Sequence, residues 1–275
     1  MTLANRKLLN KVLLAIVAIL IGTVMIIPVY ILVKVSFSDP GEILTQHPTL
    51  LPHSFTLEHW QEVLASGNLW EPLKKSLIVA TSTTVISILV VSPAAYSIAR
   101  MSRKVKYIFI ITLFLTKMFP VVGIALPISI TFLKWNLLDT NLGLILANLI
   151  GQIPFMAWIL VSTFSSLPVD LEEAAAIDGG NKLQILMRIV FPAAGQGIAV
   201  AAMYVWLNSW NEFTYALYLS LTTRTLPLTV YYYVQRGGFF QQAAYSTILA
   251  IPVIIVTFIL QRYLKSDYLT GAVKG

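Results

Sequence analysis

Two charged side chains, Lys117 and Glu212, stand inside stretches of sequence that are otherwise apolar. A charge at the centre of a bilayer costs about 2.5–3.5 kcal/mol on insertion scales, so each needs a partner helix or a wet cavity beside it. Glu212 lies close to two amides, Asn208 and Asn211, and to two tryptophans. Amides that bind hydroxyl groups and rings that stack on sugar faces suit a path for a carbohydrate.

The same polar residues also fit a structural interpretation. Tryptophans gather at membrane interfaces, and amides join neighbouring membrane helices by hydrogen bonds. Lys117 would equally fit an ion pair, or a position near the end of a span from which its ammonium reaches the interface. The sequence leaves both interpretations open.

Motifs of catalysis and of nucleotide binding are missing from the sequence. It contains no G-x-x-x-x-G-K-[ST], no G-x-S-x-G, no H-E-x-x-H and no cysteine. The three histidines, His47, His53 and His59, are six residues apart in a polar segment, and we expect them at the surface. We therefore expect no catalytic residue, no metal site and no cofactor, and energy for any work must come from another subunit or an ion gradient.

Composition excludes a soluble globular enzyme and a disordered chain. Of the 275 residues, 57% are hydrophobic and only 11% are charged, against about 45–50% and about 25% in soluble domains. The net charge of +7 fits a membrane protein that keeps Lys and Arg in cytoplasmic loops. We expect no nucleic-acid partner, because no polar segment carries a basic stripe with interleaved aromatics.

Six stretches are long and apolar enough to cross a bilayer, which takes about 20 residues. They cover residues 12–33, 76–96, 107–133, 142–164, 193–219 and 245–264. Pro120 and Pro127 interrupt the third stretch and Pro154 the fourth, which fits either simple kinks or the broken helices of transport paths. The sequence predicts an all-α polytopic membrane protein with six transmembrane helices, in which residues 1–275 form a single transmembrane domain.

Lys and Arg indicate the orientation of these spans. With the N-terminus inside, most of the 19 Lys and Arg residues fall in inner segments, above all the cluster from Arg100 to Lys106. Both termini are therefore expected in the cytoplasm. The longest inner loop then covers residues 165–192.

This inner loop has the clearest local pattern. Asp170 is placed to cap a helix, with Glu173 at the third helical position as in a capping box. Alanines follow and favour helix. Gly179 and Gly180 should then end it, since glycine adopts a left-handed cap without strain.

A second short helix is expected from about Asn181 to just before Pro192. Helices this short are marginal alone in water. The pair must therefore rest against its own spans or against a partner protein, and the pattern does not decide between them.

The loop also fits a longer pattern, namely E-A-A, three residues, G, nine residues, I, one residue, a hydrophobic residue and P. The matching residues are Glu173, Ala174, Ala175, Gly179, Ile189, Phe191 and Pro192. The loop resembles the EAA loop of permease subunits of binding-protein-dependent ABC importers, with Phe191 where leucine is usual. Residues 94–100 resemble a segment common in these permeases, and residues 210–213 resemble a segment of carbohydrate importers. Residues 226–228 and 270–275 are similar to segments of the maltose-type subfamily, whose smaller subunit has six spans and a similar length.

This resemblance implies the fold of a type I ABC importer permease in a bacterial or archaeal cytoplasmic membrane. It implies that the first loop helix docks on an ATP-binding subunit. The residues carried over to this coupling contact are Glu173, Ala174, Ala175, Asp178, Gly179, Ile189 and Pro192. The substrate path would hold Asn208, Asn211, Glu212 and Lys117, unless the partner permease carries most substrate contacts.

The implied partners are a second permease subunit in a heterodimeric pore, a dimer of ATP-binding subunits that binds the ATP, an extracytoplasmic sugar-binding protein and the lipid bilayer. The expected cargo is a di- or oligosaccharide, moved by alternating access. Glycerol phosphate or another sugar derivative is an alternative cargo. A gradient-driven secondary transporter with Lys117 and Glu212 in a relay is an alternative mechanism that gives the loop no role. An intramembrane enzyme has thin support, from one Glu and one Lys without a histidine.

Overall fold

The computed structural model describes residues 3–236 and 238–264, and all their regular structure is helical. The helices are α1 (Leu3–Phe37), α2 (Pro40–Ile43), α3 (Glu58–Ala65), α4 (Trp70–Ala99), α5 (Arg103–Lys117), α6 (Val121–Lys134), α7 (Asn141–Ser166), α8 (Asp170–Ile177), α9 (Lys182–Ile185), the π-helix η1 (Leu186–Val190), α10 (Phe191–Ala193), α11 (Gly195–Trp210), α12 (Thr214–Leu219), α13 (Leu226–Gln235) and α14 (Phe239–Leu264). The predicted all-α class is confirmed.

Among the described residues, four helices are long and apolar enough to cross a membrane. They are Asn10–Phe37, Trp70–Ala99, Asn141–Ser166 and Phe239–Ile259. Two bent pairs raise the number to six if each is counted as one span. Each of the six predicted stretches overlaps one of these elements, although the fifth runs past Trp210, and the polytopic membrane architecture is confirmed.

The third predicted stretch is two helices rather than one. α5 and α6 meet at a bend of 83°, and Pro120 stands at the start of α6 as its N-cap. Proline lacks an N–H and disfavours helix in the residue before it, so the chain turns there. Pro127 and Pro154, in contrast, lie inside α6 and α7.

The fifth predicted stretch is also shorter than expected. α11 ends at Trp210 and α12 begins at Thr214, so residues 211–213 interrupt the predicted span. The Glu212 carboxylate accepts the N–H groups of Tyr215 at 2.6 Å and Ala216 at 3.1 Å. A side chain that satisfies the free N–H groups of a new helix start explains why α12 is separate.

The chain forms two compact units. The first comprises the described residues up to Leu69 together with Val230–Ala250, and the second comprises Trp70–Thr229 and the described residues from Ile251 on. Helix α1, in the first unit, exposes most of its large apolar side chains.

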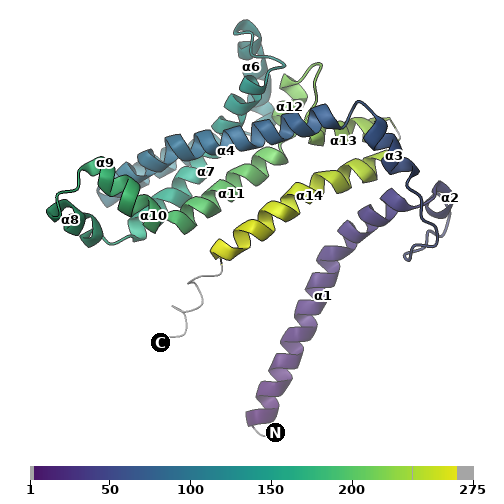
Figure 1. Cartoon of the computed structure of the whole chain (residues 1–275), viewed down its shortest axis with the longest axis horizontal. Helices are drawn as coiled ribbons and strands as arrows, with labels where there is room; N and C mark the ends of the chain where they lie inside the picture. Colours follow the sequence, from purple (N-terminus) through teal and green to yellow (C-terminus); the bar gives the residue numbers. More distant parts are fainter. Residues whose placement is uncertain (1–2, 237, 265–275) are drawn as a thin grey trace. The chain divides into compact units, whose positions relative to one another are not determined.

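In the second unit, α4, α7 and α11 pack against one another as a bundle around a shared apolar core. Its buried members include Ala95, Leu160, Phe164, Ala201 and Val205. Small residues let these helices come close, as is common between membrane helices. In Figure 1, α8 and α9 lie at one end of this bundle, and α6 and α12 lie at the other.

Candidate functional site

The start of α8 differs from the prediction. Val169, not Asp170, occupies the N-cap position, and no side chain accepts a capping hydrogen bond there. Val169 already has helical angles, with φ −67° and ψ −28°, so Asp170 falls inside the first turn. Asp170, Glu172 and Glu173 thus all stand near the positive end of the helix dipole, which favours carboxylates. The predicted capping box at this helix is wrong.

The glycine turn after α8 is confirmed. The helix ends at Ile177, and Gly179 adopts a φ of +86°, in the left-handed region that favours glycine. The N–H of Gly179 donates to the Ala176 carbonyl at 3.1 Å, and that of Gly180 donates to the Ala175 carbonyl at 3.0 Å. The chain therefore reverses tightly at this point without strain.

The second loop helix begins where predicted. Asn181 is the N-cap of α9 and forms a capping box with Gln184, through bonds of 2.9 Å and 3.0 Å. We predicted that this helix ends before Pro192. Instead, it continues through the π-helix η1 into α10. Pro192 lies in the first turn of α10, directly after the π-helix η1.

The loop presents one face to its own helices and another outward. Ile185 and Val190 are buried in the core of the α4–α7–α11 bundle, and Ala175 packs partly against it. Glu173, Ala174, Asp178, Gly179 and Pro192 are exposed, and Ile189 is half-buried. The packing of one face on the chain's own spans thus receives support, while docking of the other face on a partner stays a prediction.

The free face is unusually apolar for an exposed surface. Ile177 is 87% exposed and Leu183 is 69% exposed. Beside them a hollow of about 280 Å³ lies against Asp178, Gly179 and Arg188. Exposed apolar side chains of this kind are consistent with the predicted docking face.

Sequence reasoning missed a polar contact that ties this loop to the membrane helices. Arg100, just after α4, forms an ion pair with Glu172 in α8, and its Nε donates to Glu172 Oε1 at 2.9 Å. Arg100 Nη1 also donates to the carbonyl of Phe164 near the end of α7, at 2.9 Å. The Tyr96 hydroxyl donates to Glu172 Oε2 at 2.5 Å. The opposite charges of the 100–106 cluster and the loop were the one signal for this pair.

The residues predicted for a substrate path gather at the end of α11. Asn208 donates to the Tyr204 carbonyl at 2.8 Å, and Asn211 donates to the Leu207 carbonyl at 2.9 Å. Both amides thus satisfy their own helix backbone while standing exposed. The rings of Trp206 and Trp210 stack beside them, with centroids 5.3 Å apart.

Lys117 lies apart from this group. It is the last residue of α5 and is exposed, next to the bend between α5 and α6. Among the described residues, no carboxylate forms an ion pair with it. A lysine at a helix C-terminus suits the negative end of the helix dipole.

In the first unit, Glu42 organises the segment that follows α1. Its carboxylate pairs with the Lys34 ammonium at 2.7 Å and accepts bonds from Thr49 and Ser54. These bonds, that of Lys34 first, hold the pKa of Glu42 well below its ordinary value of 4.5.

The same unit contradicts part of the histidine prediction. His47 and His53 are exposed as expected, but His59 is buried. Its ring stacks on Phe240 with centroids 4.6 Å apart, and its Nε2 lies 3.1 Å from the Ser38 carbonyl. An aromatic neighbour distant in sequence, which no local pattern reveals, explains the burial.

The predicted tail segment 270–275 lies outside the described residues.

In the second unit, Asp139 forms a further polar centre between α6 and α7. Its carboxylate accepts the N–H groups of Leu221 at 3.0 Å and Thr222 at 3.1 Å, and it lies 3.8 Å from the Lys75 ammonium.

Known proteins resemble this chain over nearly its whole length. The family described as "binding-protein-dependent transport system inner membrane component" matches residues 76–269. The trehalose/maltose transport system permease protein MalG of Thermococcus litoralis is 30% identical over 98% of this chain and 99% of that protein. The diacetylchitobiose uptake system permease protein DasC of Streptomyces coelicolor is 27% identical over 98% and 100%.

A solved structure gives the same fold. A crystal structure of a bacterial ABC transporter involved in the import of the acidic polysaccharide alginate superposes with a TM-score of 0.76, at 23% identity, over 96% of this chain and 98% of that one.

Proposed function

The chain belongs to the family of binding-protein-dependent transport system inner membrane components, and from that membership we propose that it is the sugar-translocating permease subunit of an ABC importer. Its chemistry is transport across the inner membrane and not catalysis. The observation that carries the proposal is the family match over residues 76–269, which includes the whole exposed inner loop.

The proposed cargo is a di- or oligosaccharide. Relatives that match nearly the whole chain are named for trehalose, maltose and diacetylchitobiose. The exposed amides of Asn208 and Asn211 and the half-buried ring of Trp206 offer groups that suit sugar hydroxyls and sugar faces, while the buried ring of Trp210 stacks on Trp206. Glu212 supports this cluster by capping α12, and Lys117 lies at the bend beside α6.

The proposed coupling element is the inner loop. Glu173, Ala174, Asp178 and Gly179 stand exposed on it, and Ala175 faces the chain's own core. The exposed side would dock on an ATP-binding subunit, with Ile189 and Pro192 completing the second helix. Closure of a pair of such subunits around ATP would then push on α8 and, through Glu172 and Arg100, on α4.

The proposed assembly follows from this role. A second permease subunit would complete a heterodimeric pore, and an extracytoplasmic binding protein would deliver the sugar. Both termini would lie in the cytoplasm, and the whole chain would act as one transmembrane permease domain. The inner loop would then face the ATP-binding subunits.

Purification of the tagged chain from its native cells in mild detergent tests this assembly. We expect a second permease and an ATP-binding protein in a defined ratio. ATP hydrolysis by the reconstituted complex should rise with binding protein loaded with trehalose, maltose or a chitobiose. Stimulation by glycerol phosphate and by none of these sugars would show that the cargo is a sugar derivative. Uptake by the chain alone under an ion gradient would overturn the importer proposal.

A further inference from the structure

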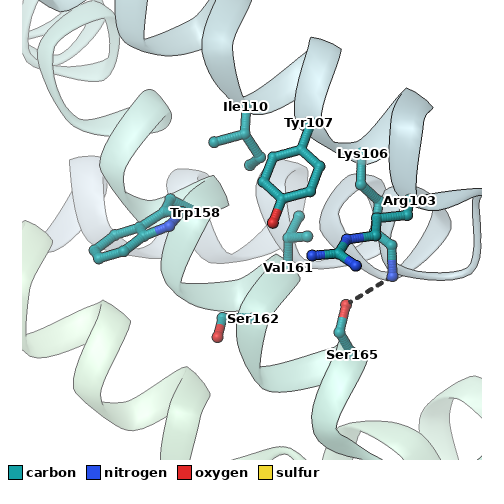
Figure 2. Close-up of a pocket in the computed structure, with 8 residues that line it drawn as sticks. All are labelled: Arg103, Lys106, Tyr107, Ile110, Trp158, Val161, Ser162 and Ser165. Carbon is teal, nitrogen blue, oxygen red and sulfur yellow. Dashed lines mark hydrogen bonds between the residues drawn. The ribbon is translucent and has the colours of Figure 1, made fainter.

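A cavity of about 420 Å³ lies in the second unit between the first half of α5 and the last half of α7 (Figure 2). From α5 it is lined by Arg103, Lys106, Tyr107 and Ile110. These residues are spaced i, i+3, i+4 and i+7, so they stand on one face of the helix. The two basic side chains come from the helix start and the two less polar ones from the turns that follow.

The opposite wall has the same gradient. From α7 the cavity is lined by Trp158, Val161, Ser162 and Ser165, again at i, i+3, i+4 and i+7. The serines lie nearer the end of α7, and the apolar pair lies deeper along the helix. Figure 2 shows Arg103, Lys106 and Ser165 gathered on one side of the cavity, and Ile110 and Trp158 on the other.

Among the described residues, the two cations in this cavity contact neutral groups. The Lys106 ammonium donates to the Ala99 carbonyl at 3.0 Å and to Ser165 Oγ at 3.3 Å. The Arg103 guanidinium lies over the Tyr107 ring, 5.7 Å from its centroid. Among the described residues, no carboxylate forms an ion pair with either. Two adjacent positive charges without an acidic partner favour an anionic ligand.

We propose that this cavity binds an anionic phospholipid, with the headgroup phosphate at Arg103 and Lys106 and an acyl chain along Ile110, Val161 and Trp158. A gradient from cations and hydroxyls to apolar side chains, aligned with two membrane helices, matches an amphiphile better than a water-soluble anion. Basic pockets between transmembrane helices at the cytoplasmic side bind such headgroups. Trp158 and Tyr107 are about half exposed, so the apolar part of the cavity opens sideways to lipid.

The inference rests on the proposed function in one respect, since it places this end of α5 at the cytoplasmic leaflet. The test uses the purified complex in detergent. Native mass spectrometry measures the binding of phosphatidylglycerol and of phosphatidylcholine with the same acyl chains. The wild-type complex should retain phosphatidylglycerol in preference to phosphatidylcholine.

The variants separate charge from shape. Arg103→Gln combined with Lys106→Gln should weaken phosphatidylglycerol binding about 30-fold, which corresponds to about 1 kcal/mol for each basic side chain. Lys104→Gln, at an exposed position of α5 that does not line the cavity, is the matched control and should bind as the wild type does. Ser162→Trp fills the cavity without changing charge and should also abolish binding. This variant keeps the test decisive if the double variant fails to fold.

Three results would overturn the proposal. They are equal retention of the two lipids, equal binding by the double variant and by Lys104→Gln, and displacement of the lipid by an equal concentration of inorganic phosphate. Failure of this proposal leaves the proposed function intact, because ATP hydrolysis stimulated by loaded binding protein is measured on the same preparations. Conversely, a complex that binds the lipid but never couples ATP to uptake would contradict only the proposed function.

Discussion

The guanidinium of Arg100 and the carboxylate of Glu172 join the inner loop to the ends of two membrane helices. Arg100 follows α4 directly, and its guanidinium also donates a hydrogen bond to the carbonyl of Phe164 in α7. Glu172 belongs to α8. The side chains of both partners are mostly buried, 21% and 15% exposed, so water weakens their attraction only in part. A displacement of α8 must therefore either move the ends of α4 and α7 or break this pair.

Removal of this pair should uncouple transport more than it unfolds the protein. In Arg100→Ala, Glu172 keeps only the Tyr96 hydroxyl bond, and we expect a loss of about 1–3 kcal/mol in stability. Uptake should fall by more than tenfold, while basal ATP hydrolysis by the complex persists. Proteoliposome uptake and ATP hydrolysis, measured on the same preparation, check this expectation.

Two further variants, one in this contact and one beside it, serve as controls. Arg100→Lys keeps the charge but loses the fork that contacts Glu172 and Phe164 together, so it should lie between the wild type and Arg100→Ala. Lys104→Ala removes an exposed charge nearby and should behave as the wild type does. Normal uptake by Arg100→Ala would show that the pair does not transmit motion.

Gly179→Asp should abolish uptake while the chain still inserts into the membrane. The φ of +86° lies in the left-handed region, which costs most residues about 1–2 kcal/mol and aspartate less, and no atom blocks a side chain there. The added carboxylate also stands on the exposed face proposed to dock. Ala176→Asp adds the same charge to an exposed position with helical angles, so its comparison separates the strained turn from the charge. Normal uptake by Gly179→Asp would contradict the coupling role of this loop.

The all-helical membrane fold could be predicted from the sequence because long apolar stretches have one stable solution in a bilayer. The turn at Gly179 and the cap at Asn181 followed from local chemistry that needs no distant partner. The break after Trp210 was missed because Glu212 was interpreted as a charge in a span and not as the acceptor for the start of α12.

Contacts between distant segments could not be predicted from the sequence. The burial of His59 depends on Phe240, which no local pattern indicates. The position of Glu172 depends on Arg100, for which opposite charge was the one signal. The cavity at Arg103 likewise requires that α5 and α7 face each other. The sequence therefore predicted the elements and the exposed loop, while the partners of their side chains became known only from the structure.

Gly197→Ala should destabilise the packing of α11 against α7. A Cβ at this position would lie 2.2 Å from the Thr163 Oγ1 and 2.8 Å from the Thr163 Cβ, so backbone must shift. Overpacking of this kind costs about 1–3 kcal/mol. Gly195→Ala, in the same helix, meets nothing within 4 Å and is the matched control. A thermal midpoint measured in detergent should fall for Gly197→Ala alone, and equal midpoints would contradict the close approach.

Asp139 should make the second unit sensitive to acid. Burial raises the pKa of this carboxyl, but the bonds from Thr222, Thr223 and Leu221 outweigh burial and hold the pKa below its ordinary value of 3.8. A lowered pKa in the folded state stabilises the protein above the ordinary value, and this contribution is lost as the pH falls from there through the folded value. The thermal midpoint should therefore drop more steeply with acid in the wild type than in Asp139→Asn.

The hydroxyl of Thr222 offers a matched pair of variants for the same centre, because it donates to the Asp139 carboxylate. Thr222→Ser keeps that donor and should preserve the acid dependence of the wild type. Thr222→Val removes the donor while keeping the branched shape, so the pKa of Asp139 should rise toward its ordinary value and the acid-dependent part of the stability should shrink. Identical pH profiles for the serine and valine variants would show that this hydrogen bond does not set the charge state of Asp139.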